Sequence, residues 1–305
     1  MLTEIYRKDA NNPGDWFCNP IRYFWPGADV NSIDIDSVKK TTWGMKDPMI
    51  VGGGGLIGNE NFAKLMTRIT VHPDELLLID VLDIKLKQIG EENRAAIIRW
   101  KEQIQQITVD AMSRLDRKVG ARILWGAGFN DRVTDNLYDV EWPDYMGRFD
   151  LVGVRDHGAD FRWVPCASCM HPLFNRQYEI TNEIVWFEHK KRLLDNKTFD
   201  KIPAPRMLNT GQNLQQVLEF LGSAETVITN SYHGVYWATL LGRKVVCIPW
   251  GSKFHAFKHP PTMATDKNWQ DMIPKAVSYL DALDECRTVN KDFYQDVVNI
   301  IDKKR

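Results

Sequence analysis

The stretch "ETVITNSYHGVYWATLLGRKVVCIPW", residues 225–250, has the pattern of a strand, a helix and a second strand in succession. The β-branched run 226–229 predicts a buried strand, and the apolar residues within 235–241 predict a helix that ends at Gly242. A unit of this kind joins two parallel strands of one sheet. The pattern also places His233 where the chain leaves the first strand and enters the helix.

The rest of the chain repeats this alternation of short apolar runs and longer mixed segments, which is typical of βα units. We expect further strands within 1–7, 47–58, 121–131, 149–154, 178–191 and 243–250, and helices within 11–25, 59–69, 90–116, 155–161, 209–225 and 290–305. The fold class predicted is α/β, with two Rossmann-like domains facing a cleft. A proline-containing segment without periodicity places the domain boundary near 172–178, which gives domains 1–174 and 175–305, and the final helix could pack back on the first domain.

Length and charge exclude several function classes. The chain has 305 residues, beyond the size at which one core usually keeps growing, and its 39 Lys and Arg against 40 Asp and Glu give a net charge of -1. No general basic field for nucleic acid is therefore present. No signal peptide is visible, and the apolar runs are far shorter than the ~20 residues of a membrane span. The five cysteines suit a reducing compartment, so a cytoplasmic location is expected.

One cysteine pair could have a special role. Cys166, Cys169 and His171 have the spacing that begins some zinc sites, but a second ligand pair at matching spacing is missing. A redox pair is a second interpretation, and ordinary buried or loop thiols are the third and simplest.

Polar side chains follow several predicted strands, and ligands of open α/β sheets bind at the carboxyl ends of strands. Asn12 and Asp15 follow the first strand, and the glycine run 52–55 follows another. These glycines would let the backbone approach a ligand closely, although tight packing is an equal alternative. Arg155 follows an apolar strand, where its planar fork suits a carboxylate or phosphate. An ion pair with Asp156 is the rival interpretation.

His233 has the most informative position. In the first turn of its helix it lies near the positive end of the helix dipole, which disfavours the imidazolium ion unless an anion is close. Gly234 would leave room beside it for such a ligand. Lys253 comes just after the next strand end, within a basic loop. The alternatives are a structural histidine and a solvated loop.

The chain resembles the polysaccharide pyruvyl transferase superfamily. The resemblance covers most of the sequence as ordered landmarks, of which the last is the most specific: "NPGDWF", "VGGGGLIG", "LWGAGF", "VGVRD" and "ITNSYHGVYWATLLGRKVV". It implies a GT-B-like fold and transfer of a pyruvyl group from phosphoenolpyruvate (PEP) to hydroxyls of a glycan or lipid-linked saccharide. The product would be a cyclic ketal in surface polysaccharide biosynthesis, made without a metal or cofactor.

The resemblance also implies roles for individual residues. His233 and Asp15 would be the acid/base residues; Arg155, Lys253, Ser231, Tyr232 and Gly234 would bind the donor; Asn12, Gly53 and Gly54 would face the acceptor. Many members of the family have an arginine two residues before the histidine, where this chain has Ser231.

Two alternatives belong to other classes. A glycosyltransferase of the same architecture would bind the diphosphate of a nucleotide sugar at a helix N-terminus. A non-catalytic glycan-binding protein would use some of the 11 Trp residues to contact sugars. The sequence leaves the acceptor sugar and the oligomeric state open. The basic C-terminal helix could also contact the inner face of the membrane, although packing between domains is the simpler use.

Overall fold

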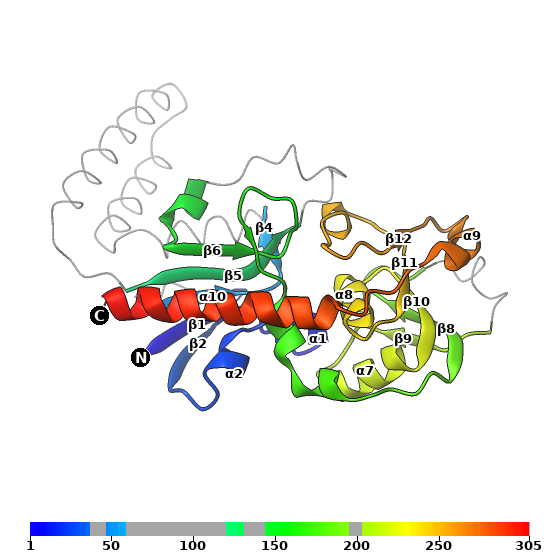
Figure 1. The fold of residues 1–305 in the computed structure, drawn as a ribbon, viewed down its shortest axis with the longest axis horizontal. Helices are drawn as coiled ribbons and strands as arrows, with labels where there is room; N and C mark the ends of the chain where they lie inside the picture. The colour runs from blue at the N-terminus through cyan, green and yellow to red at the C-terminus, as the bar shows by residue number, and fades with distance from the viewer. Residues whose placement is uncertain (37–46, 59–119, 131–143, 195–202, 305) are drawn as a thin grey trace, which may run out of the picture.

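The computed structural model describes residues 1–36, 47–58, 120–130, 144–194 and 203–304 (Figure 1). These residues form a mixed α/β fold with two sheets, and every strand pairing within each sheet is parallel. The helices expected within 59–69 and 90–116 lie outside the described residues.

The first sheet contains the strands expected in the N-terminal half, together with two strands that the sequence did not predict, β2 and β7. Its order is β2-β1-β3-β5-β6-β7, and β4 pairs with β5. The strands are β1 (Leu2–Tyr6), β2 (Val30–Asp34), β3 (Met49–Gly52), β4 (Gly55–Ile57), β5 (Arg122–Phe129), β6 (Leu151–Val154) and β7 (Arg162–Trp163). Strands β3 and β5 are buried along almost their whole length, which explains why their sequences are continuous apolar runs rather than alternating ones.

The second sheet contains the stretch 225–250 as a βαβ unit, as the sequence predicts. Its order is β12-β11-β10-β8-β9, built from β8 (Asn182–Glu188), β9 (Arg206–Leu208), β10 (Ala224–Thr229), β11 (Lys244–Cys247) and β12 (Thr262–Met263). In this sheet the chain moves from β8 to one side, and then returns to the other side of β8 through β10. The first sheet reverses in the same way between β1 and β3. Each sheet therefore has a topological switch point, where α/β proteins place ligands.

Helices cover the sheets and connect them. The α-helices are α1 (Pro13–Trp16), α2 (Ile21–Phe24), α7 (Leu214–Gly222), α8 (Tyr232–Leu240), α9 (Trp269–Met272) and α10 (Ala282–Lys304). Short 3-10 turns are η3 (Asp144–Arg148), η4 (Ala167–Met170), η5 (Pro172–Asn175), η6 (Ser252–Phe254) and η7 (Ile273–Lys275). In the described part of the chain, no helix is both long enough and apolar enough to cross a membrane.

Two helix predictions need correction. The segment 11–25 forms two short helices rather than one, because Asn19 and Pro20 interrupt it and Asn19 accepts the N–H of Ile21. The helix expected within 155–161 does not form. Only seven residues separate β6 from β7, Gly158 has φ of +89°, and the N–H of His157 is bonded to a loop of the second half.

The long helix α10 begins beside α8 and η4 and then runs along the first sheet (Figure 1). Phe293, Val297 and Ile301 pack there against Ile50 and Ile123. The side chain of Asn290 in α10 also bonds to the first half of the chain. It accepts the indole N–H of Trp125 at 2.8 Å and donates to the carbonyl of Pro165. Helix α10 is thus part of the hydrophobic core that covers the first sheet.

Candidate functional site

The N-terminus of α8 presents His233 at the switch point of the second sheet. Ser231 caps the helix by accepting the N–H of Gly234, as expected for a strand that ends in small polar residues. At the other end Gly242 has φ of +67°, and the N–H of Arg243 reaches the carbonyl of Ala238. The short helix is therefore fixed at both ends, and it holds His233 in its first turn.

The imidazole of His233 lies between the two halves of the protein. A Cβ added to Gly14 in α1 would come well under 3.0 Å from Nδ1, a separation that real side-chain carbons do not adopt. On its other side, Nε2 lies 3.6 Å from the thiol of Cys166. His233 is 5 % exposed. The contact with Gly14 joins the first sheet's switch point to that of the second sheet.

The surroundings of His233 keep its ring neutral. Burial lowers its pKa well below the ordinary value of 6.5, and the positive charges of Arg155 and Lys253 lower it further. A bound anion would oppose both cations and raise the pKa. The histidine is therefore able to take up a proton when an anionic ligand arrives.

Arg155 is held flat between an aromatic ring and backbone. Its guanidinium carbon lies 3.7 Å from the centre of the Tyr232 ring. A Cβ on Gly128 would overlap its Nε, so the side chain passes directly over that glycine. Arg155 is 3 % exposed, and its Nε finds no hydrogen-bond partner among the described residues. A buried donor without a partner is costly, which favours an anionic ligand as the partner.

Lys253 belongs to a cationic cluster that sequence reasoning missed. Its ammonium lies 3.9 Å from the centre of the Trp250 ring, and the guanidinium of Arg192 lies 4.5 Å from the same centre. Asn230 ties the cluster together, because it accepts the N–H of His189 and donates to the carbonyl of Arg192. The signal in the sequence was the run His189 to Arg192, which directly follows β8.

Burial and the neighbouring cations also act on His189. Burial, followed by Lys253, Lys190, Arg192 and Lys191, lowers its pKa to about 4. The ring is therefore neutral at physiological pH. The cations that add to the effect of burial, Lys253, Lys190, Arg192 and Lys191, concentrate positive charge here, which suits a ligand with more than one negative charge.

Asp15 and Asn12 form the opposing side of the site. Asn12 donates to Asp15 at 2.7 Å, and Asn209 donates to both Asn12 (3.1 Å) and Ser231 (3.2 Å). Burial raises the pKa of Asp15; Asp9 adds to this, whereas Arg7, Arg155 and Lys253 oppose it. The carboxyl group is thus a better base than an exposed aspartate. Asn209 was not singled out from the sequence, where nothing marks it.

The glycines have more varied surroundings than expected. Gly54, with φ of +84°, lies beside Asp15, so its backbone faces the site. Gly53 instead packs tightly on Cys18. The room expected beside Gly234 is not there, because Thr229 and Phe187 fill it. Gly234 is therefore a packing position, where a side chain would collide with the core.

The cysteine interpretations can also be compared with the geometry. All five cysteines are buried thiols, and among the described residues no three His, Cys, Asp or Glu side chains gather as a metal site requires. Cys166 contacts His233, Cys169 contacts Asn290, and His171 accepts the N–H of Leu173 at the start of η5. The three residues of the motif thus have three separate local roles.

Comparisons with known proteins give no relative. No family model, no curated protein and no solved structure matches the chain. The chemistry of the site is therefore inferred from its own residues: a neutral histidine, two buried cations beside it, and a carboxylate across from it.

Asp156, next to Arg155, allows the effect of burial on a carboxyl group of the site to be tested. Its Oδ2 accepts the N–H of Phe129 at 2.6 Å, while Oδ1 finds no partner in the described residues. Burial raises its pKa from 3.8 to about 6, although Arg155 opposes the shift. The neutral carboxyl stabilises the fold below about pH 4, and this stability is lost as the pH rises through about 6.

Asp156→Asn is therefore expected to stabilise the protein by about 1–3 kcal/mol at neutral pH, because the amide cannot ionise. Thermal unfolding should show a higher Tm for the variant at pH 7.5, with the difference shrinking toward pH 4.5. A difference independent of pH would show that ionisation of Asp156 does not govern this stability.

Proposed function

We propose that the protein transfers a pyruvyl group from PEP to two hydroxyls of a glycan or lipid-linked saccharide, forming a cyclic ketal. The observation that carries the proposal is the neutral imidazole of His233 with the buried cations Arg155 and Lys253 acting on it. Arg155 and Lys253 would bind an anion, and the charge of that anion would at the same time allow His233 to acquire a proton.

We further propose that the two sheets belong to two domains arranged as in GT-B enzymes. In this proposal the first domain, 1–174, carries the acceptor side and the second, 175–305, the donor side. The supporting contacts join the two switch points: Lys190 donates to Asp9 at 2.7 Å, and the N–H of Gly211 donates to Asn11. Such polar contacts between loops are typical of surfaces that can separate and close.

PEP carries a carboxylate and a phosphate, so it would occupy two cationic groups. Arg155, with its unpartnered buried Nε, is the proposed ligand of one, and Lys253 with Arg192 the proposed ligands of the other. In this arrangement Arg192 would supply the guanidinium that Ser231 does not. The negative charge of PEP would raise the pKa of His233 and load it with a proton.

The first step would join the acceptor to PEP. Protonated His233 gives its proton to the methylene carbon of PEP, C2 acquires oxocarbenium character, and a sugar hydroxyl forms the new C2–O bond. The proton of that hydroxyl passes to Asp15, whose burial makes it a competent base. The result is a tetrahedral intermediate that carries methyl, carboxylate and phosphate groups.

The second step would close the ketal. The second hydroxyl forms a C2–O bond while the bond from C2 to the phosphate oxygen breaks. Neutral His233 takes the proton of this hydroxyl, and the proton held by Asp15 leaves with phosphate. The products are the pyruvyl ketal and inorganic phosphate. Both side chains return to the states that they have with PEP bound, and His233 releases its proton to solvent when phosphate leaves.

A glycosyltransferase with a nucleotide-sugar donor is the second candidate. The cluster of Trp250, Arg192 and Lys253 favours it, because an aromatic ring with two cations suits a diphosphate with an attached base.

Phosphate release from PEP, measured with a panel of free and lipid-linked oligosaccharides, tests the proposal. We expect release that depends on the acceptor, and stabilisation of the protein by PEP in thermal-shift measurements. Stabilisation by UDP- or GDP-sugars without any effect of PEP would favour the glycosyltransferase. Binding of oligosaccharide without release of phosphate from PEP would favour a non-catalytic glycan-binding protein.

A further inference from the structure

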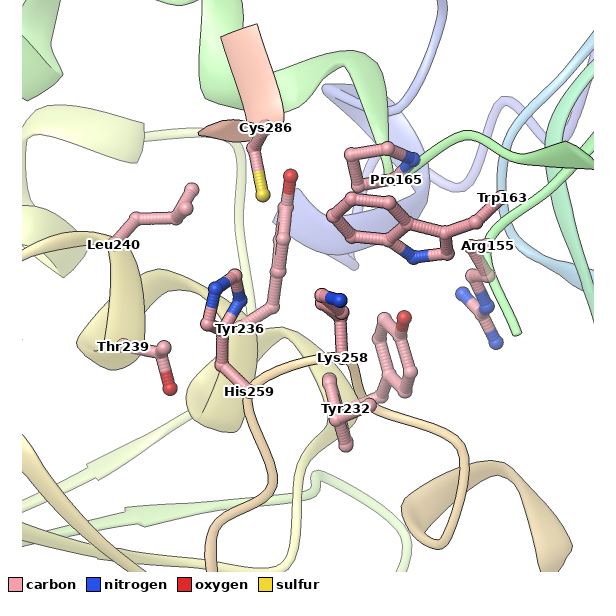
Figure 2. A pocket seen from close by; sticks show the side chains of 11 residues that line it. Arg155, Trp163, Pro165, Tyr232, Tyr236, Thr239, Leu240, Lys258, His259 and Cys286 are labelled. Atoms are coloured by element: carbon pink, nitrogen blue, oxygen red, sulfur yellow. The ribbon is translucent and has the colours of Figure 1, made fainter. Parts of the chain in front are cut away.

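A small pocket lies next to the site, and Tyr232 and Arg155 are among the residues that line it (Figure 2). Trp163 of β7, Tyr232 of α8 and Lys258 line it. Both halves of the chain therefore contribute residues to the pocket. Its volume is about 20 Å³. A single water needs roughly 10–15 Å³. The pocket therefore has room for a group of about two oxygen atoms and not for a whole sugar ring.

Four side chains that line the pocket, Arg155, Trp163, Tyr232 and Lys258, carry hydrogen-bond donors. Tyr236, Thr239 and His259, which can donate or accept, line it as well. In Figure 2 the indole nitrogen of Trp163, the hydroxyl of Tyr232 and the ammonium of Lys258 are turned toward the same part of the pocket, with the guanidinium of Arg155 beside the Tyr232 ring. Trp, Lys and Arg side chains donate and do not accept. Burial raises the pKa of Tyr232, so its hydroxyl keeps its proton and can donate as well.

The pocket also lacks a negative charge of its own. None of the described residues that line it carries a carboxylate. The acidic side chain beside it, Glu285, is engaged by His259 at 2.7 Å. The converging donors of Trp163, Tyr232 and Lys258, with the guanidinium of Arg155 beside them, fit a small oxyanion. A carboxylate, which has two oxygens on one carbon, is the oxyanion that matches the volume of the pocket.

We propose that this pocket binds the carboxylate of a uronic acid in the acceptor saccharide. The pocket and His233 are neighbours through Tyr232, whose ring centre lies 5.4 Å from that of the histidine. The sugar ring would lie outside the mouth of the pocket, where Lys258 is exposed. The assignment of the carboxylate to an acceptor rests on the proposed function, whereas its binding in the pocket does not.

Binding of glucuronic acid, compared with glucose, tests this inference by calorimetry or ligand-observed NMR on the full chain. We expect the wild type to bind glucuronic acid and not glucose. Lys258→Gln and Trp163→Phe should each weaken that binding roughly tenfold, because the first removes a positive charge and the second a hydrogen-bond donor, and each keeps most of the side-chain volume. Lys267→Gln, a change at an exposed lysine far along the loop, is the matched control and should bind as the wild type does.

The inference would be overturned by equal binding of the two sugars, by no binding of glucuronic acid, or by binding that either Lys258→Gln or Trp163→Phe leaves unchanged. Binding of pyruvate that depends on Lys258 and Trp163, without binding of glucuronic acid, would reassign the pocket to a donor carboxylate and also overturn it. The proposed pyruvyl transfer and the proposed carboxylate pocket can be rejected independently of each other. Glucuronic acid could bind in a protein that releases no phosphate from PEP, which would reject the pyruvyl transfer and retain the carboxylate pocket.

Discussion

Replacement of His233 by alanine is expected to lower the rate of phosphate release from PEP by roughly 10²–10⁴-fold, the usual contribution of a general acid–base residue. The imidazole is the proposed donor of the proton that activates PEP. Burial and the nearby cations lower its pKa well below 6.5, so that the ring is neutral at neutral pH. We therefore expect binding of PEP to be accompanied by uptake of a proton.

This coupling gives a second measurement on the same variant. Calorimetry of PEP binding in buffers of different ionisation enthalpy should show proton uptake by the wild type, and less uptake by His233→Ala. His255→Ala, a change at an exposed histidine of the neighbouring loop, is the control that should keep both turnover and uptake. Near-normal turnover in His233→Ala, with the fold intact by circular dichroism, would remove His233 from the mechanism.

Gly14→Ala is expected to lower turnover by roughly 10²-fold, since displacement of a reacting group by about 1 Å has an effect of that size. The added methyl group would occupy the space of the His233 ring, so either α1 or the imidazole must move. Alanine is otherwise the better residue in a helix by about 1 kcal/mol. The loss of activity should therefore come without a matching loss of helix structure.

Gly147→Ala is the matched control for this substitution. Gly147 lies in η3, and a Cβ there would meet nothing within 4 Å. We expect Gly147→Ala to have wild-type turnover. Normal turnover in Gly14→Ala as well would show that contact between α1 and His233 is not needed during catalysis.

The local parts of the site follow from the sequence, because short-range rules determine them. The strand before Asn230, the cap at Ser231 and the C-terminal glycine Gly242 are each specified by residues within one turn. They place His233 in the first turn of α8 before any tertiary contact is considered. The glycine loop after β3 follows for the same reason, since Gly53 and Gly54 both adopt positive φ.

The long-range parts of the site could not be obtained in this way. Cys166 is 67 positions from His233, and Asn209 is 197 positions from Asn12, so no local pattern connects them. The position of Gly14 against the imidazole depends on how the two sheets meet. The contact of Trp250 with Arg192 and Lys253 depends on how β8 and β11 are placed within the second sheet. The wrong helix after Arg155 has the same origin, because a backbone bond from His157 to the second half holds that segment in turns.

The position of α10 has a consequence for the order of events during synthesis. Phe293, Val297 and Ile301 complete a core whose other members, such as Ile50 and Ile123, lie far earlier in the chain. The first sheet therefore cannot complete this core until residue 301 has left the ribosome. The apolar surface that α10 covers lacks that cover while the whole second sheet is translated, and such surface makes a nascent chain prone to associate with others or to need a chaperone.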